Sequence, residues 1–484
     1  MKLKADTLDI LLTHSHFLCH DLADQPVAYV YPPLGLLYLS AYLKKEKAGE
    51  VEIFDSTFAN GEKEFEQYIK VHHPSLIGIQ TIITTRSITR NLLNICHNVG
   101  IPVVVGGPDA SACYTKYLDW GADYVVIGEG EETCLELLQF ITGQSIYREG
   151  DIKGLAYKSN GQVVVNEKRP LIQDLDSIPL PDWQAIDIGK YLALWRQKNG
   201  YTSLQILTSR GCPFGCSWCS HAVYGQTLRQ RSVDNVIKEM RALSALYDPD
   251  TIWFADDTFT IDPFWIKSFT DKVAQCGDII PFRCFTRADR VSPEVLTELK
   301  AVGCRLIHMG VESGSQRVLD KMNKGQNVDI IKKASTYIHD AGIEINYFIM
   351  FGYPGEKLQD IRATEKLIQE TKPDSIGFSI AYPIPGTEFH KSIENSLDKN
   401  IESLWEKTTK NVQKMFPTEF PLLYYRLTIQ HIQLRNMRRN SSDRGIRKIT
   451  TELEILFLAV GRWVIERIWL SRNILSSFNL VSRG

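Results

Sequence analysis

The chain has 484 residues, which is enough for two or three domains of ordinary size. Apolar residues make up 44% of it and charged residues 23%, as in soluble globular proteins. The formal net charge of −2 gives the whole molecule no electrostatic basis for binding nucleic acid, so we expect no such partner. Charges near the start (Lys2, Lys4, Asp6) are unlike a signal peptide, and no run of about 18 uncharged apolar residues suits a membrane span. We therefore expect a cytoplasmic protein.

Short β-branched runs alternate with helical stretches over residues 1–150. Strands are expected at 8–13, 51–54, 76–81, 102–106 and 124–127, with helices at 35–44 and 85–99. This alternation predicts βαβ units and a parallel sheet, so the first region is expected to be α/β and Rossmann-like. No GxGxxG motif opens a helix, which argues against NAD. Polar, glycine-bearing segments follow three of the strands, where ligands bind in such folds, at 80–86, 106–111 and 128–133.

We interpret residues 151–200 as a linker. Asn160-Gly161 predicts a tight hairpin, because Asn-Gly favours the left-handed turn that a two-residue loop needs. The proline-bearing segment 179–183 is expected to be extended and stiff.

Residues 201–395 return to strand–helix alternation with a longer period. Six strands are expected, at 204–208, 251–254, 282–285, 306–310, 344–351 and 375–381. In barrel folds built from such units, the reacting groups lie at the carboxyl ends of the strands. The residues of interest at those ends are Asp256, Arg287, Glu312, Ser313, Gly352 and Pro354. Taken singly they also have structural interpretations, with Asp256 as a helix cap and Glu312 as a partner of Arg317.

Cys212, Cys216 and Cys219 follow the first of these strands with the spacing CxxxCxxC. This spacing brings three thiolates to one metal centre, and three soft ligands suit an iron–sulfur cluster better than a closed tetrahedral zinc site. Zinc would need a fourth ligand, for which His221 is the nearest candidate. The sequence offers no second pair of closely spaced ligands, which zinc sites usually have, so zinc is possible but unsupported. A [4Fe-4S] cluster on three cysteines leaves one iron free to bind another molecule. The other seven cysteines show no pairing rhythm, as in a reducing cytoplasm.

The tail from residue 426 to the end is basic, with 11 Lys or Arg against four acidic residues. Residues 452–470 are rich in apolar side chains, interrupted by Arg462, Glu466 and Arg467. Such a segment can form an amphipathic helix in a membrane interface. The interpretation that we favour is a helix that packs on the barrel with a solvated basic face.

The cysteine loop, the aromatic Trp218 before its third cysteine and the ordered strand-end motifs resemble the radical S-adenosylmethionine (SAM) superfamily. The α/β region in front resembles the cobalamin-binding domain of the group that includes methyltransferases and the anaerobic magnesium-protoporphyrin ester cyclase. The resemblance covers about residues 1–395. It implies a Rossmann-like cobalamin-binding domain (1–150), a linker with a hairpin (151–200), a partial (β/α)6 TIM-type barrel (201–395) and a helical, basic C-terminal region (396–484).

The resemblance also implies the site residues. Cys212, Cys216 and Cys219 would bind a [4Fe-4S] cluster whose free iron chelates SAM. The residues implied beside SAM are Trp218, Asp256, Arg287, Glu312, Ser313, Gly352 and Pro354. Those implied beside cobalamin are Pro33, Leu34, Gly35, Thr81, Thr84, Gly106, Gly107, Pro108 and Glu129. The DxHxxG pattern of cobalt-ligating domains is absent around His14, His16 and His20, so we expect cobalt to have no protein histidine below it.

The activity implied is methylation of an unactivated carbon, by way of a 5′-deoxyadenosyl radical and methylcobalamin. The substrate would be a small molecule, and the apolar tail favours a lipid, an isoprenoid or a tetrapyrrole. An external one-electron donor such as flavodoxin or ferredoxin would be a partner, and the tail would give peripheral membrane contact if it lies in an interface. The alternatives are a radical cyclase or oxidative rearrangement enzyme and, from another class, a cobalamin or cluster sensor without turnover.

Overall fold

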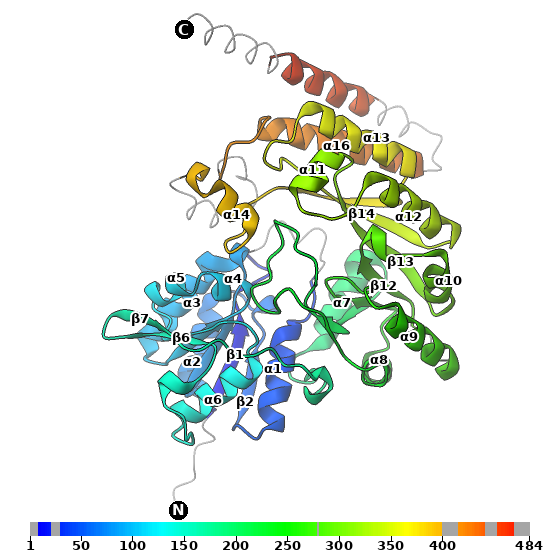
Figure 1. Cartoon of the computed structure of the whole chain (residues 1–484). Helices are drawn as coiled ribbons and strands as arrows, with labels where there is room; N and C mark the ends of the chain where they lie inside the picture. Colours follow the sequence, from blue (N-terminus) through cyan, green and yellow to red (C-terminus); the bar gives the residue numbers. More distant parts are fainter. Residues whose placement is uncertain (1–7, 21–29, 278–279, 399–414, 441–452, 469–484) are drawn as a thin grey trace, which may run out of the picture.

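The structure is a computed structural model of the whole chain, and it describes residues 8–20, 30–277, 280–398, 415–440 and 453–468. Two β-sheets flanked by helices dominate it, and further helices follow at the C-terminal end (Figure 1). The predicted fold class is therefore confirmed: a Rossmann-like N-terminal part, an open barrel-type sheet of parallel strands and a helical C-terminal part.

The first sheet has seven strands in the order β2-β1-β3-β4-β5-β6-β7. β1 to β5 pair in parallel, and β6 and β7 join antiparallel at one edge. The strands are β1 (Ile10–His14), β2 (Val51–Phe54), β3 (Leu76–Gln80), β4 (Val103–Gly106), β5 (Tyr124–Val126), β6 (Leu155–Ser159) and β7 (Gln162–Val165). The hairpin predicted at Asn160-Gly161 is present, with φ values of 51° and 78°, and it extends this sheet.

Helices cover both faces of the first sheet. They are α1 (Leu34–Lys45), α2 (Glu62–His72), α3 (Arg86–Val99), α4 (Pro108–Ala112), α5 (Tyr114–Asp119) and α6 (Glu131–Ile141). Phe65 of α2 and Leu92 of α3 belong to the core on one face, and Leu43 of α1 and Leu137 of α6 to the core on the other. Burial on both faces explains the continuous apolar runs of the parallel strands.

The second sheet has six parallel strands in the order β15-β14-β13-β12-β11-β8, so the six predicted β/α units are confirmed. They are β8 (Ser203–Ile206), β11 (Thr251–Phe254), β12 (Phe282–Thr286), β13 (Cys304–Glu312), β14 (Glu344–Phe351) and β15 (Ser375–Ile380). The helices of this part are α7 (Ile188–Asn199), α8 (Val233–Tyr247), α9 (Pro263–Cys276), α10 (Pro293–Ala301), α11 (Gln316–Lys321), α12 (Val328–Asp340), α13 (Leu358–Thr371), α14 (Glu388–Ile393) and α16 (Leu422–Asn440).

Alternation along these strands separates an outer face from an inner one. Outward side chains such as Phe254, Cys284 and Tyr347 are buried in one core with the helices. Inward side chains on the neighbouring positions, such as Trp253 and Phe285, are only half-buried. Within the described residues, the edge strands β8 and β15 do not pair with each other, so the sheet stays open and does not close into a barrel.

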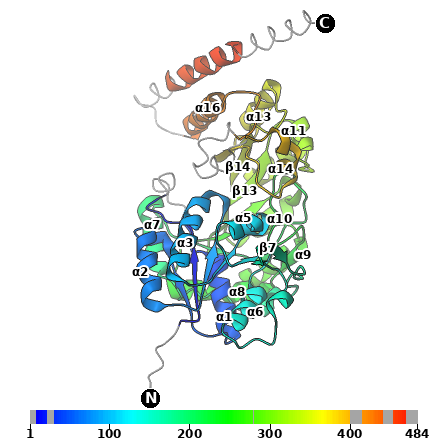
Figure 2. The same cartoon turned by 90° about the vertical axis from the view of Figure 1, so that its left-hand side faces the viewer.

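A C-terminal helix spans residues 453–468 and lies beside α16, far from the first sheet in both views (Figures 1 and 2). Its protein-facing side is charged. Arg462 lies 2.5 Å from Glu365 and 2.8 Å from His431, and Glu466 accepts a hydrogen bond from Tyr424 at 2.7 Å. The same side also makes apolar contacts, since Leu458 is buried and Ile465 packs against the core of the second sheet. Seven other apolar side chains of this helix are exposed, namely Leu453, Leu456, Phe457, Val460, Trp463, Val464 and Ile468.

The favoured expectation for this segment is therefore corrected. The helix packs on its neighbours, as expected, but its packing face carries Arg462 and Glu466 beside the buried Leu458, and its exposed face is largely apolar and not basic. The physical reason is that Glu365 and His431 offer buried partners to Arg462, and buried charges must be paired. The predicted segment also includes 452 and 469–470, which lie outside the described residues. Within the described residues, no helix is both long and apolar enough to cross a membrane.

Candidate functional site

The three cysteines lie on a loop at the carboxyl end of the second sheet, directly after β8. Two short strands, β9 (Ser209–Arg210) and β10 (Arg229–Gln230), pair antiparallel at its base. Gly211 has a φ of 86°, and a Cβ there would lie 2.5 Å from the Thr227 carbonyl oxygen, so the turn into the loop requires glycine. All three thiols are free and half-buried. In the described part of the chain, no three ligand-type side chains are gathered closely enough for a single metal ion.

Asp256 holds the start of this loop in place. Its buried carboxylate accepts four hydrogen bonds, from the backbone N–H and the hydroxyl of both Thr208 and Ser209, at 2.6–3.0 Å. Burial raises the pKa of Asp256 to about 6. Three of these bonds end on Oδ1 and one on Oδ2, so Asp256 ties the start of the cysteine loop to the end of β11.

Two cations face the thiols. The Arg287 guanidinium lies 3.7 Å from Cys216 Sγ and 3.7 Å from the centroid of the Phe214 ring, and it donates to the Lys324 carbonyl at 2.7 Å. The Lys324 ammonium lies beside the third cysteine. Burial, and after it the negative charge of Asp257, raise the pKa of Cys219 to about 12, and the Lys324 charge opposes that shift. Three thiols beside two cations fit an anionic thiolate-bound cluster.

Glu312 and Trp218 surround the Lys324 ammonium. Glu312 Oε1 lies 3.0 Å from Lys324 Nζ, and the centroid of the Trp218 ring lies 5.2 Å from it. Glu312 ends β13 with a φ of 64°, next to a shift in strand register. This conformation is costly for a residue other than glycine and often marks a functional position. Lys324 was missed in the sequence, because nothing in its neighbours shows that the turn after α11 folds it onto Glu312.

The remaining strand-end residues shape two neighbouring turns. The fully buried Ser313 hydroxyl accepts from the Ser315 N–H and lies 3.2 Å from the Thr364 hydroxyl, so its bonds are internal. Gly352 follows β14 with a φ of 78° and donates its N–H to Glu356 at 2.7 Å. Pro354 lies in the same turn, half-buried.

A cavity of about 280 Å³ lies between the first sheet and the cysteine loop. Its first-sheet wall includes Gly35, Gly106, Gly107, Pro108 and Glu129, and its opposite wall is the segment 220–225 that directly follows Cys219. The predicted residues Pro33, Leu34, Thr81 and Thr84 do not line it. The cavity thus adjoins the segment that carries the thiols.

The two glycines of this wall play different roles. A Cβ on Gly106 would meet no atom closer than 3.9 Å, so the residue borders free space. A Cβ on Gly107 would lie 2.5 Å from the Thr81 carbonyl oxygen, and φ there is 110°, so Gly107 is required by the backbone itself.

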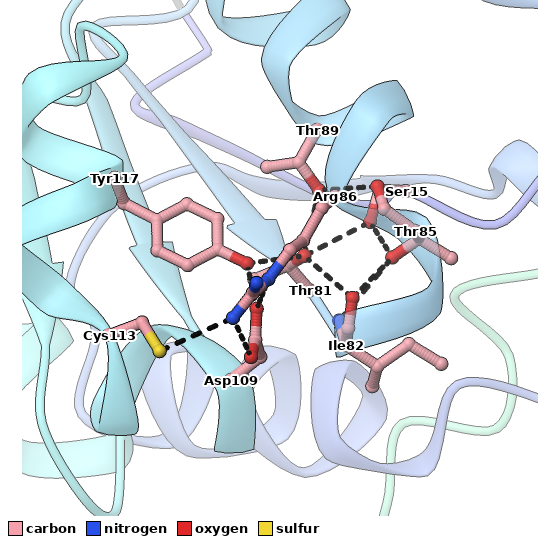
Figure 3. A network of polar contacts seen from close by, with 9 residues as sticks. All are labelled: Ser15, Thr81, Ile82, Thr85, Arg86, Thr89, Asp109, Cys113 and Tyr117. Carbon is pink, nitrogen blue, oxygen red and sulfur yellow. Dashed lines mark hydrogen bonds and ion pairs between the residues drawn. The ribbon is translucent and has the colours of Figure 1, made fainter. Parts of the chain in front are cut away.

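The loop after β3 is supported by a buried polar network (Figure 3). Arg86 and Asp109 form a two-pronged ion pair at 2.6 and 2.8 Å, and the Tyr117 hydroxyl donates to the same carboxylate. The Thr81 hydroxyl lies 2.7 Å from that of Thr89. Thr81 is therefore held internally, whereas Thr84 is exposed on the loop.

Glu129 belongs to an ion cluster that joins the first sheet to β9 and β10 at the base of the cysteine loop. It accepts from Arg210 at 2.7 Å and from Arg229 at 2.8 Å, and Glu131 accepts from Arg210 at 2.5 Å. All four side chains are 3–7% exposed. Arg210 lies two residues before Cys212, so this cluster connects the cavity wall to the start of the cysteine loop. Sequence reasoning missed Arg210 and Arg229, because ion pairs so distant along the chain leave no local signal.

The N-terminal histidines have partners of their own. His14 Nε2 lies 3.1 Å from Asp55, and its Nδ1 accepts from the His16 N–H, while His20 lies 2.9 Å from Glu62. His221 differs from them, since it lines the cavity and its buried Nε2 has no hydrogen-bond partner within the described segments.

Comparison with known proteins places these features in a family. The radical SAM superfamily model matches residues 206–368, and the B12-binding domain model matches residues 23–138. The chain is 32% identical over 396 residues to an uncharacterised methyltransferase of Pyrococcus horikoshii, covering 78% of this chain and 82% of the relative. It is 26% identical to the anaerobic magnesium-protoporphyrin IX monomethyl ester cyclase of Rubrivivax gelatinosus, covering 77% and 68%.

Among solved structures, the radical SAM methyltransferase TsrM of Kitasatospora setae superposes with a TM-score of 0.68 at 21% identity, covering 80% of this chain and 76% of TsrM. A likeness at that identity shows the shared fold. The family-model matches and the archaeal relative show more: the chain belongs to the radical SAM methyltransferases that carry an N-terminal B12-binding domain.

Proposed function

We propose that this chain transfers a methyl group to an unactivated carbon of a small-molecule substrate, using a [4Fe-4S] cluster, SAM and cobalamin. The observation that carries the proposal is the continuity of the two sites: residues 220–225 leave the cysteine loop and form a wall of the cavity whose other wall is Gly106-Gly107-Pro108. When bound, these cofactors supply a radical and a transferable methyl group. TsrM structures hold cobalamin, a [4Fe-4S] cluster and a SAM analogue.

In the second sheet we assign the residues as follows. Cys212, Cys216 and Cys219 hold the cluster, and Arg287 and Lys324 neutralise its thiolates. The Glu312 carboxylate is paired with Lys324 at 3.0 Å and is turned to the same side by its left-handed backbone, so it is a hydrogen-bond acceptor for SAM. Asp256 positions the start of the cysteine loop, and Ser313 positions the turn that follows β13. Trp218 closes the site beside Lys324 and excludes water.

In the first sheet, Gly35, Gly106 and Pro108 border the space for cobalamin, and the Arg86–Asp109 pair supports the loop that carries Thr84. The ring nitrogens of His14 are both engaged, which supports a cobalt without a histidine from β1. We propose the division 1–150, 151–200, 201–395 and 396–484 for the chain, with β6 and β7 of the linker packed on the first sheet.

The test is anaerobic reconstitution with cluster and cobalamin, incubation with SAM and extracts of the cells that make the protein, and mass spectrometry of the metabolites. The proposal expects a metabolite heavier by one methyl group, with S-adenosylhomocysteine and 5′-deoxyadenosine formed beside it. The variant with all three cysteines replaced by Ala should form none of these three products. A product that has lost hydrogens or gained oxygen, without S-adenosylhomocysteine, would favour the cyclase reaction of the Rubrivivax relative.

Cluster reduction requires an electron source, and we propose an external one-electron donor such as flavodoxin or ferredoxin. None of the ten cysteines forms a disulfide, which supports a cytoplasmic location.

We also propose that the C-terminal helix contacts a membrane surface. Phe457 and Trp463 are 76% and 56% exposed on its apolar face, and the sequence before it carries Arg444, Arg447 and Lys448. Aromatic side chains on one face with basic residues beside them are typical of interfacial helices that bind anionic lipid.

Vesicle flotation tests this contact. The protein should float with vesicles that contain phosphatidylserine and less with phosphatidylcholine alone. Phe457→Ser with Trp463→Ser should remove the binding, whereas Phe264→Ser, on an 86% exposed side chain of α9, should not. Equal flotation of all three proteins would contradict the proposal, and so would a concentration-dependent dimer that the double variant alone abolishes.

A further inference from the structure

The inner face of the second sheet is lined by aromatic side chains on consecutive strands. Trp253 of β11 and Phe285 of β12 have ring centroids 5.2 Å apart, and Phe285 lies 5.7 Å from Phe348 of β14. Between them, His308 of β13 stacks on Phe348 at 5.6 Å with a 15° angle between the rings. All four side chains are half-buried and face away from the helical core. Together they form a largely aromatic, half-buried face on the inner side of the sheet.

One cation, Arg283 of β12, interrupts this surface. Its guanidinium carbon lies 5.9 Å from the Tyr31 ring centroid, 5.3 Å from that of Trp195 and 5.3 Å from that of Trp253. Among the described residues, its guanidinium donates one hydrogen bond, to the Tyr31 hydroxyl, and its buried Nε has no partner. A guanidinium has five N–H donors, so several remain available.

Within the part of the chain that the structure describes, no carboxylate neutralises Arg283 by forming an ion pair with it. Burial raises the pKa of Tyr31 to about 12, so its hydroxyl is uncharged at neutral pH. Burial lowers the pKa of His308 to about 4, so the imidazole is neutral too. The Trp253 indole N–H is a further buried donor without a partner. A charge left in this state is costly unless an anion completes it.

The strand geometry relates Arg283 to the cluster site. Arg283 and Arg287 are four residues apart on β12 and its extension, so they point to the same face, separated by roughly 13 Å at about 3.3 Å per residue. Arg287 contacts Cys216, as described above. The aromatic side chains therefore line the path between the cysteine loop and Arg283.

We infer that the inner face of the second sheet binds the substrate, with the aromatic side chains around its apolar body and Arg283 on an anionic group at its far end. The inference rests on the proposed function in one respect, namely that the bound molecule is the one methylated. It gives the substrate a class: an apolar or aromatic molecule whose carboxylate or phosphate lies roughly 13 Å from the level of the cysteine loop.

Isothermal titration calorimetry on the protein loaded with cluster and cobalamin tests this inference without turnover. Three probes share one aromatic body: 1-naphthaleneacetate, 1-naphthyl phosphate and the neutral 1-naphthaleneacetamide. Wild-type protein should bind one of the anions at least about tenfold more tightly than the amide, as expected for a charge-assisted contact. Whichever anion binds more tightly identifies the group as a carboxylate or a phosphate.

Arg283→Gln should abolish the preference for the anion and leave binding of the amide unchanged. Arg305→Gln, an exposed arginine of β13, is the matched control and should behave as wild type. If Arg283→Gln fails to fold, the ratio of anion to amide affinity in the wild type still shows whether the site prefers an anion. A wild-type ratio near one, or a ratio unaffected by Arg283→Gln, overturns the inference. A preserved ratio in a protein that forms no methylated product contradicts the proposed function alone.

Discussion

Replacing Arg210 by Met removes the cation that joins the first sheet to the cysteine loop. Its guanidinium lies 2.7 Å from Glu129 and 2.5 Å from Glu131, and its side chain is 6% exposed. Removing one partner of a buried pair costs about 3–5 kcal/mol, because the other charge is left buried and unpaired. Glu129 keeps Arg229 at 2.8 Å, whereas no other ion pair of Glu131 occurs among the described residues. We therefore expect a loss at the lower end, about 3 kcal/mol.

Urea unfolding of the reconstituted protein measures that loss, and the iron content after gel filtration measures its effect on the loop. Arg210→Met should unfold at lower urea and retain less iron, because β9 carries Arg210 into the loop. Arg169→Met is the matched control: Arg169 pairs with Glu132 and Glu136 of α6 but does not reach the second sheet. It should lose stability and keep its iron. If Arg210→Met keeps the wild-type urea midpoint and iron content, the reasoning about this cluster is refuted.

Three further predictions concern single residues. Gly106→Val should fold normally but lose cobalamin on gel filtration, because its side chain enters the cavity. Gly107→Ala should instead lower the melting temperature even without cobalamin, because its Cβ meets the Thr81 carbonyl oxygen. The same outcome for both variants would contradict the assignment of the two glycines. Lys324→Met should weaken SAM binding in equilibrium dialysis about tenfold, since Glu312 loses its buried partner. Lys333→Met, at an exposed lysine, is the control and should bind SAM as the wild type does. Equal SAM affinities of the two variants would exclude Lys324 from the SAM site. Burial raises the pKa of Glu356 to about 8, so the folded protein keeps a proton that the unfolded chain releases above about pH 4.5. The free energy of unfolding should therefore fall as the pH rises from about 5 to 8. Glu356→Gln should flatten this fall, because the amide does not titrate, and its oxygen can still accept the hydrogen bond from the Gly352 N–H. An unchanged slope would show that Glu356 is not the titrating group.

Local patterns were sufficient for the sheets. Apolar β-branched runs predicted the parallel strands, and Asn160-Gly161 predicted its hairpin, because turn chemistry depends on two adjacent residues. The strand-end positions also followed, since the carboxyl end of a strand is visible in the sequence. The spacing of Cys212, Cys216 and Cys219 indicated the thiol loop for the same reason.

Contacts between residues far apart in the sequence determine the surroundings of the site residues and the packing of the C-terminal helix. Asp256, Ser313 and Glu129 stay predicted cofactor neighbours, but the sequence did not reveal the partners that hold them: Thr208, Thr364 and Arg229 lie 48, 51 and 100 residues away. The charged packing face of the C-terminal helix depends on Glu365 and His431, which periodicity within the helix does not reveal. Such partners become visible only when the chain is folded.

The central claim is that both cofactor sites serve one methyl transfer. The most direct measurement is a count of the products formed from SAM per methylated molecule, by mass spectrometry of the reconstituted protein. The account predicts about one S-adenosylhomocysteine and about one 5′-deoxyadenosine per product, with methylation lost and some 5′-deoxyadenosine retained when cobalamin is withheld. Product formation accompanied by 5′-deoxyadenosine but no S-adenosylhomocysteine would contradict it.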